Sequence, residues 1–439
     1  MNLKSGIIIF FLMFSFSAYA QEKEDTQVDM EKTETADSND FVEEKGVKFK
    51  FSGYFKDLFM YTSTDNYSGS PVEMPGSFKN LISNMQRIRL SPELQISNGL
   101  IIHADWDNEV VMSSYNRSME FNNTWKPSQY NNLFQPSWIP YDDNSILYRT
   151  KLHRAYLKLN LPIFTFSIGR QQIRFGSGKL WNPLDILNPV SPTYVEGAED
   201  QQGTDAVKMD VFFNEKTELT LVYDQKRMSD NINDIQYING NSVARFKTTF
   251  SETDVAVMGG WVARKGIAGI DVSSVFFKGI LRGALLFSYP EDKNWYFQLN
   301  AGYEYNFQFG LSITGEYFYN GNGMNANSSL KSAFTQSMFT GINQGNYYKF
   351  ANQILTYNQH FLGLAVGYEF LPLLRGDFFT IYDIQGNGLF MTLALKYNVM
   401  ENLDAVIGGM FGFVFAGNSS DFQNLNNHPM LYATLQLYF

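Results

Sequence analysis

Charged side chains recur at alternate positions of the chain, and this spacing is the clearest sign of chemistry in the sequence. Arg87 and Arg89 are separated by one residue, as are Asp105 and Asp107, and Glu109 follows two positions farther on. Because successive side chains of a β-strand point to opposite faces, the members of each set would share one face of a strand. Four more cations at even spacings extend the basic set: Arg154, Lys158, Arg170 and Arg174.

Two interpretations of these basic and acidic sets remain open. On neighbouring strands, opposite charges can pair with each other and hold a wall together. On the wall of an aqueous passage, rings of Arg or Lys favour anions, and rings of carboxylates favour cations. In either case we predict that all of these side chains line an interior wall, as pore-lining residues.

The elements that must position these charges are strands. In the range 84–97 the apolar side chains Ile88, Leu90, Leu94 and Ile96 alternate with polar ones, and the polar face includes both arginines. The Asn98-Gly99 pair that follows is the strongest short signal for a hairpin turn. Alternation and turn residues of this kind place about 18 strands between Val47 and Phe439, with 16 as the other even count that fits.

The chain ends on an alternating strand, residues 430–439, whose apolar face runs from Leu431 to Phe439. An exposed apolar edge strand invites aggregation, whereas a closed barrel leaves no edge. The alternative is the last strand of a soluble sandwich. This ending resembles the C-terminal signature of bacterial outer-membrane β-barrels, which the outer-membrane assembly machinery reads.

The composition agrees with an all-β fold that crosses a membrane as an antiparallel barrel. Aromatic residues make up 16% of the chain and charged residues only 18%. A high aromatic content suits a barrel with aromatic girdles at both membrane interfaces. Long polar connections alternate with short turns through most of the chain, as in barrels with long external loops and short periplasmic turns.

The N-terminal region predicts two short segments ahead of a single barrel domain, residues 47–439. Residues 1–20 have an early lysine, a short apolar run and a small-residue ending, which is typical of a cleaved signal peptide. Residues 21–46 are acidic and poor in apolar side chains, which indicates a disordered periplasmic leader or a tail that binds a partner.

The stretch from Gly169 to Tyr194 carries the most specific pattern. The alternation changes phase near Gly169, so we expect a β-bulge there that turns Arg170 and Arg174 inward and away from lipid. The Gly-, Trp- and Pro-rich segment after it is either a packed surface turn or a loop folded into the lumen as a constriction. In the second case Trp181 and Tyr194 would stack on a planar solute, with Asp185 in the same loop.

The pattern Gly-Arg-Gln-x-x-x-Phe-Gly-x-Gly-x-x-Trp-x-Pro-x-Asp, residues 169–185, resembles the strand-to-loop motif of porin-like families that include alginate-export-type barrels. The resemblance covers only this short stretch. It implies an outer-membrane channel with an arginine-rich lumen for an anionic polysaccharide. The acidic residues Asp105, Asp107 and Glu109 differ from the uniformly basic lumen that the resemblance implies.

The sequence also bears on three other classes of function. An outer-membrane enzyme is disfavoured, because the chain has neither a Gly-x-Ser-x-Gly elbow nor a His-Glu-x-x-His motif. No basic patch with interleaved aromatics suggests nucleic acid, and we expect neither a cofactor nor a metal site. A barrel that acts as a scaffold or sleeve for a secretion or electron-transfer partner remains the main alternative.

Taken together, these features predict a Gram-negative outer-membrane porin, surrounded by lipid, through which small hydrophilic and possibly anionic or saccharide solutes diffuse.

Overall fold

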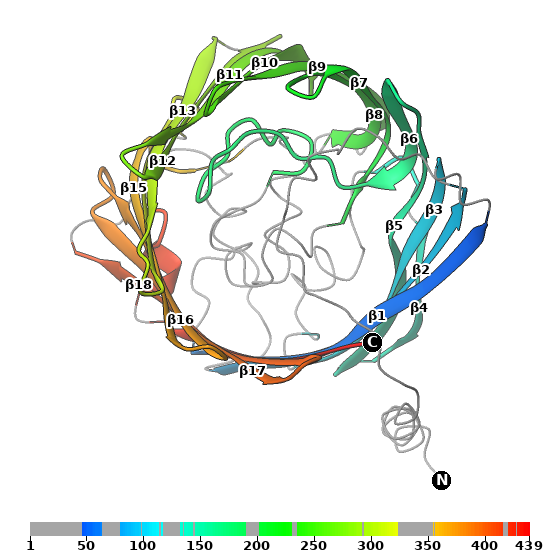
Figure 1. Cartoon of the computed structure of the whole chain (residues 1–439). Coiled ribbons are helices and arrows are strands. Elements are labelled where there is room, and N and C mark those ends of the chain that lie inside the picture. The colour runs from blue at the N-terminus through cyan, green and yellow to red at the C-terminus, as the bar shows by residue number, and fades with distance from the viewer. Residues whose placement is uncertain are drawn as a thin grey trace. The chain divides into compact units, whose positions relative to one another are not determined.

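The computed structural model contains a closed ring of antiparallel strands (Figure 1). The first strand starts at Val47, where the barrel was expected to begin. The segments expected at 1–20 and 21–46 lie outside the described residues, apart from residue 46. The described residues are 46–63, 80–97, 99–113, 116, 132–134, 136–143, 145–189, 202–230, 235–291, 294–323, 354, 356–415, 420–426 and 428–439.

Strands account for nearly all of the regular structure in the described residues. No helix among these residues is both long enough and apolar enough to cross a membrane. The only helical element that the structure defines there is a short 3-10 turn, Gln423–Leu425. The strands are β1 Val47–Ser63, β2 Asn80–Ile96, β3 Leu100–Ser113, β4 Ser137–Asp142, β5 Ile146–Asn160, β6 Phe164–Gln171, β7 Thr204–Asn214, β8 Thr217–Asp230, β9 Ile235–Phe250, β10 Thr253–Val262, β11 Lys265–Phe276, β12 Gly279–Pro290, β13 Tyr296–Asn306, β14 Leu311–Asn320, β15 His360–Leu371, β16 Leu374–Asp383, β17 Gly388–Met400, β18 Leu403–Val414 and β19 Met430–Tyr438.

The ring contains 18 of these 19 strands, because β4 is not one of its members. Each strand of the ring pairs with its neighbours in sequence order, and β1 closes the ring by pairing with both β2 and β19. The pairing of β6 with β5 covers only the range 155–160 of β5, and β4 pairs with the range 147–151 of the same strand. The predicted 18-strand barrel is thus confirmed and 16 is excluded.

The strand β4 corrects one expectation, because the whole range 113–146 was read as a connection. Since β6 leaves the wall after Gln171, the upper part of β5 would otherwise keep an open edge with unpaired backbone groups. The short strand β4 supplies those partners.

All of the long connections lie at one end of the barrel, here called the long-loop end. The opposite, short-turn end carries tight turns, among them residues 215–216, 251–252 and 401–402. This arrangement agrees with the alternation of long and short connections expected from the sequence. The long connections are residues 64–79, 114–145, 172–203, 321–359 and 415–429.

Side chains alternate between the outside and the inside of the wall. On β13, Gln298 and Asn300 point inward and are fully buried, while their neighbours form the apolar outer face. Large apolar side chains are exposed on the outside around the ring, among them Leu281, Leu393 and Ile407. An apolar exterior over a polar inner face is the pattern of a transmembrane barrel.

The junction between β1 and the C-terminus closes the ring tightly. The backbone N–H of Gly53 donates to the carbonyl oxygen of Phe439 at 2.8 Å, and the N–H of Phe439 donates back at 3.0 Å. A Cβ added to Gly53 would lie 2.3 Å from the carbonyl oxygen of Arg89 and 2.9 Å from the Phe439 ring. A larger side chain at position 53 would therefore clash with both neighbouring strands.

We expect Gly53→Val to reduce the yield of closed barrel, because backbone atoms of β2 cannot move aside without breaking ladder hydrogen bonds. The measurement is the fraction of purified protein that migrates as the compact form on an unheated denaturing gel. Gly315→Val is the matched control, because a Cβ at Gly315 would have no atom within 4 Å. Equal compact fractions for the two variants would contradict this explanation of ring closure.

Candidate functional site

Opposite charges meet on the inner faces of β2, β3 and β5. Arg89 lies directly across from Asp107 in the register, and its Nε and Nη2 donate to the two carboxylate oxygens at 2.6 and 3.0 Å. Arg87 lies across from Glu109, and its Nε donates to Oε1 at 2.8 Å. The bidentate contact between Arg89 and Asp107 fixes both side chains in the plane of the carboxylate.

Glu109 is the centre of this group and is fully buried. Its Oε2 accepts from Arg149 Nη2 at 2.6 Å, and Lys151 Nζ lies 2.8 Å from its Oε1. With Arg87, three cations surround one carboxylate. We call the inner surface formed by these residues the charged wall: Arg87, Arg89, Asp105, Asp107, Glu109, Arg149, Lys151 and Arg154.

The side of the charged wall nearer the short-turn end is less buried. Asp105 accepts from Ser91 Oγ at 2.7 Å and lies 3.0 Å from His103 Nε2. The other ring nitrogen of His103 lies 3.2 Å from Glu93. Arg154 is paired with Asp105 in the register and donates to Gln172 at 2.8 Å.

The structure places the predicted charges of β2, β3 and β5 together, mostly as buried pairs. Arg87, Arg89 and Asp105 are each no more than 6% exposed, and Asp107 and Glu109 are fully buried. The interpretation that these charges pair across neighbouring strands therefore describes their geometry. Lys158 also belongs to β5 and is half-buried.

Sequence reasoning missed Arg149 and Lys151. The register between β3 and β5 shifts between Asp105 and Trp106, which leaves His153 as an extra residue on β5. The inward-facing positions on β5 therefore change from odd to even residue numbers at His153. Arg149 and Lys151 face inward before this point, and Arg154 faces inward after it. The adjacent polar pair His153-Arg154 is the sequence signal that marks this change of phase.

The bulge predicted near Gly169 is wrong. Strand β6 pairs without a break against both β5 and β7 through this residue, and Gly169 instead has a φ of 122°. Arg170 avoids lipid by a different route. Its guanidinium donates to Asp205 on β7 at 2.8 and 3.0 Å and to the carbonyl oxygens of Leu152 and Phe134. Arg170 is 4% exposed, and its charge is satisfied within the wall.

After β6 the chain leaves the wall and runs inside the ring (Figure 1). We call residues 172–189 the inner loop. Its apolar side chains, including Ile173, Phe175 and Leu184, pack against inward-facing residues of β7 to β12. Of the two alternatives left open by the sequence, the loop folded into the lumen is the one that the structure shows.

Two carboxylates on the inner wall hold the inner loop in place. Glu316 on β14 accepts three consecutive backbone N–H groups, from Lys179 at 2.8 Å, Leu180 at 3.0 Å and Trp181 at 3.1 Å. Asp271 on β11 accepts from both the backbone N–H and the hydroxyl of Ser177. Neither carboxylate was recognised from the sequence, because its partners lie far away in the chain.

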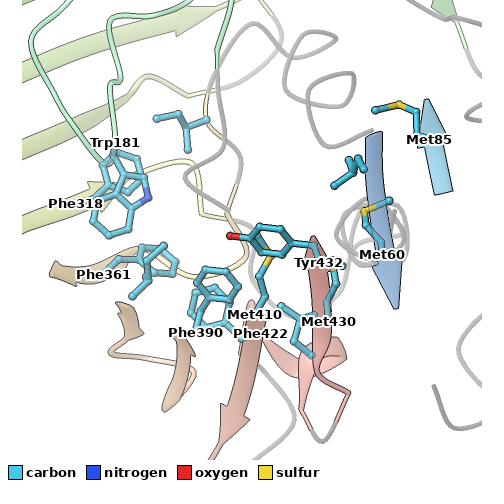
Figure 2. Close-up of a cluster of buried hydrophobic side chains, with 14 of the residues drawn as sticks. Met60, Met85, Trp181, Phe318, Phe361, Phe390, Met410, Phe422, Met430 and Tyr432 are labelled. Atoms are coloured by element: carbon cyan, nitrogen blue, oxygen red, sulfur yellow. The ribbon is translucent and has the colours of Figure 1, made fainter. Parts of the chain in front are cut away.

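Trp181 is a packing residue of the inner loop (Figure 2). Its ring stacks on Phe318 with centroids 5.4 Å apart and lies 6.2 Å from the ring of Phe361. Only 2% of its surface is exposed, so the expected stacking on a solute has no open ring face in this structure. Gly363 leaves room for it, since a Cβ there would lie 2.7 Å from the indole. The other predicted stacking residue, Tyr194, lies outside the described residues.

Arg174 and Asp185 form an ion pair within the inner loop, with Nε and Oδ2 3.2 Å apart. The Arg174 side chain is 42% exposed, whereas Asp185 is almost fully buried. Burial raises the pKa of Asp185 from 3.8 to about 7, although Arg174 opposes the shift. Between these two values the folded protein keeps a proton that the unfolded chain releases. The stability from this group is therefore greatest at low pH and falls as the pH rises to about 7.

We expect the anion preference of ion flow through the barrel to increase as the pH falls from 8 to 6. Below about pH 7 Asp185 is neutral, so the charge of Arg174 is no longer balanced. The measurement is the reversal potential in a salt gradient at both pH values. Asp185→Asn should reduce the change, and an equal change in that variant would contradict the assignment to Asp185.

Comparison with known proteins identifies the fold. No protein-family model and no curated protein sequence matches the chain. Among solved structures, OccAB4 of Acinetobacter baumannii is 11% identical with a TM-score of 0.52, and the match covers 89% of this chain and 98% of that one. The fold is that of an outer-membrane porin.

Two further porins agree with this identification. OccK8 (OprE) of Pseudomonas aeruginosa is 9% identical, and OccK2 (OpdF) of the same species in complex with glucuronate is 8% identical. Both have a TM-score of 0.53, and both matches cover 89% of this chain and 98% of the porin. The predicted fold, a Gram-negative outer-membrane porin barrel, is confirmed. Among the residues that the structure describes, no group of three or more acidic or histidine side chains is arranged to hold a metal ion.

Proposed function

We propose that the protein is a channel in the bacterial outer membrane through which small hydrophilic solutes diffuse. The observation that carries this proposal is the closed 18-strand ring with charged side chains on its inner wall. A ring of this size encloses more space than wall side chains alone can fill. The inner loop narrows that space, and solutes pass without covalent chemistry. The alternating last strand and Phe439 support recognition by the outer-membrane assembly machinery.

The charge balance favours anionic solutes, including acidic saccharides. The charged wall holds five cations against three carboxylates, so its net charge is positive. Buried charges in a low-dielectric wall still act on the potential of the lumen. OccK2, which shares the fold, has been solved with glucuronate, an anionic sugar. We extend that solute class to this chain.

Direct contacts with solute fall to the cations that are not fully buried. Arg154 and Lys158 on β5 are half-buried, and the side chain of Arg174 on the inner loop is 42% exposed. The buried members of the charged wall set the sign of the field, and these three side chains meet the solute.

The experiment is a swelling assay with proteoliposomes that contain the purified protein. We expect glucuronate to enter faster than glucose at low ionic strength, with a smaller difference at high salt because exposed charges are screened. Replacement of both Arg154 and Lys158 by glutamine should reduce the glucuronate rate more than the glucose rate. Rates equal to those of protein-free liposomes for both sugars would refute the channel. Equal rates for the two sugars at low salt would refute the anionic selectivity alone.

A further inference from the structure

The outer face of β1, β2 and β3 carries a group of polar side chains, here called the outer polar patch: Asp57, Asn84, Gln86 and Asn108. Asp57 on β1 lies directly across from Gln86 on β2 in the register. Asn84 Nδ2 donates to Asp57 Oδ1, and Tyr148 on β5 donates its hydroxyl to Asn108 Oδ1 at 3.2 Å. The first hydrogen bond links β1 with β2, and the second links β3 with β5.

The alternation of burial shows that these side chains point outward. Asp57 stands between Lys56 and Leu58, which face the inside and are 5% and 1% exposed. Asn108 stands between Asp107 and Glu109, which are both fully buried in the charged wall. Since neighbours on a strand point to opposite faces, Asp57 and Asn108 belong to the exterior.

The outer polar patch lies inside the apolar band of the exterior and not beyond its edge. On each of the three strands, the outward positions on both sides of the patch are apolar. Phe59, next to Asp57 on this face, is 43% exposed, and Ile82, next to Asn84, is 50% exposed. The bracketing pairs are Phe55 and Phe59 on β1, Ile82 and Ile88 on β2, and Trp106 and Val110 on β3.

The exterior of β10 to β19 gives the contrast. From β10 to β19 the outward positions contain no Asp, Glu, Lys, Arg, Asn or Gln. Charged residues of those strands, such as Arg282 and Asp404, belong to the inward phase. The polar side chains of β1 to β3 therefore differ from the apolar outer surface of β10 to β19.

Lipid tails offer no hydrogen-bond partner, so this face needs a polar occupant within the membrane. We propose that the outer polar patch is the centre of an interface with a second copy of this chain. Carboxamides both donate and accept, so a face built from Asn84, Gln86 and Asn108 is complementary to itself, as a two-fold interface requires. Trp138, which is 59% exposed and packs edge-on against Trp106, provides an aromatic anchor of the kind found at such interfaces.

The test uses the natural absence of cysteine in the chain. Single variants Asn84→Cys, Gln86→Cys and Asn108→Cys are oxidised in intact outer membranes with copper phenanthroline, and covalent dimers are scored on a reducing and a non-reducing gel. We expect at least one of them to form dimers several-fold faster than the control Ile407→Cys. Ile407 is outward on β18, apolar in its surroundings and 68% exposed.

The cross-linking experiment tests the interface in the membrane-embedded protein, and its result does not depend on whether the lumen conducts. Dimers that form from the patch variants and not from Ile407→Cys support the interface. Addition of Gln86→Leu to Asn108→Cys should then slow dimer formation, since it removes one of the self-complementary groups. Cross-linking from all three patch variants at the rate of Ile407→Cys would overturn the proposal and leave a non-protein occupant, such as lipopolysaccharide sugars, on this face.

Discussion

Replacement of Glu316 by alanine is expected to release the inner loop from β14. The carboxylate of Glu316 accepts three backbone N–H groups of the loop and the side-chain amide of Asn300 at 2.8 Å. Hydrogen bonds to a charged group contribute about 1.5–3 kcal/mol each, and the three N–H groups would lose their acceptor in a buried site. A loss of about 3 kcal/mol changes the ratio of packed to released loop by roughly 100-fold.

The consequence for ion flow follows from the position of the loop inside the ring. A released loop no longer narrows the lumen in one fixed shape, so Glu316→Ala should raise the mean conductance and the noise of the open state. Glu316→Gln keeps an acceptor of the same size and should fall between the alanine variant and the wild type. The matched control is Glu369→Ala at the short-turn end, where the side chain is 59% exposed and its carboxylate lies 3.9 Å from Arg375. Identical conductance traces for Glu316→Ala and Glu369→Ala would show that Glu316 does not hold the loop.

Replacement of Glu109 by glutamine is expected to destabilise the barrel more than any other change in the charged wall. Glu109 is fully buried and contacts Arg87, Arg149 and Lys151 at 2.6–2.8 Å. Glutamine keeps the shape and removes the negative charge that Arg87, Arg149 and Lys151 share. Breaking a buried ion pair on one side typically costs about 3–5 kcal/mol. The free energy of unfolding in guanidinium, measured on the protein in lipid vesicles, should fall by that amount.

Two further variants separate charge balance from general disruption. Glu218→Gln removes a half-exposed carboxylate that pairs with Arg245 at 3.1 Å, and such pairs contribute only about 0–1 kcal/mol. The double variant Glu109→Gln with Lys151→Gln should recover part of the loss, because one excess cation is removed. If Glu109→Gln cost no more than Glu218→Gln, the charged wall would not depend on Glu109 for its stability.

The parts of the fold that depend on local alternation were predictable from the sequence. The range 88–96 and the last strand alternate strictly, and both pair as expected, because a slip by one residue would turn every apolar side chain to the wrong face. The Gly- and Trp-rich segment after Gly169 predicted a loop inside the lumen as one of two alternatives, and the structure contains it.

The parts that depend on distant partners were not predictable. Trp181 is surrounded by Phe318 and Phe361, and its loop is held by Glu316, all more than 130 residues away in the chain. The phase change at His153 on β5 was not expected, and the one expected at Gly169 on β6 is absent. The sequence shows that a run of inward cations must change phase somewhere, but only the pairing of β5 with β3 decides where the extra residue lies.

The most direct test of the central claim is the single-channel conductance of the purified protein in a planar bilayer, with a salt gradient across it. The account predicts stepwise openings and a reversal potential that favours anions, because the charged wall is net positive and Arg174 is half-exposed. The anion preference should be smaller in Arg154→Gln and larger at pH 6 than at pH 8. A protein that inserts as a folded barrel and passes no current would contradict the proposed channel function. That result would favour the alternative, a barrel that serves as a sleeve for a partner.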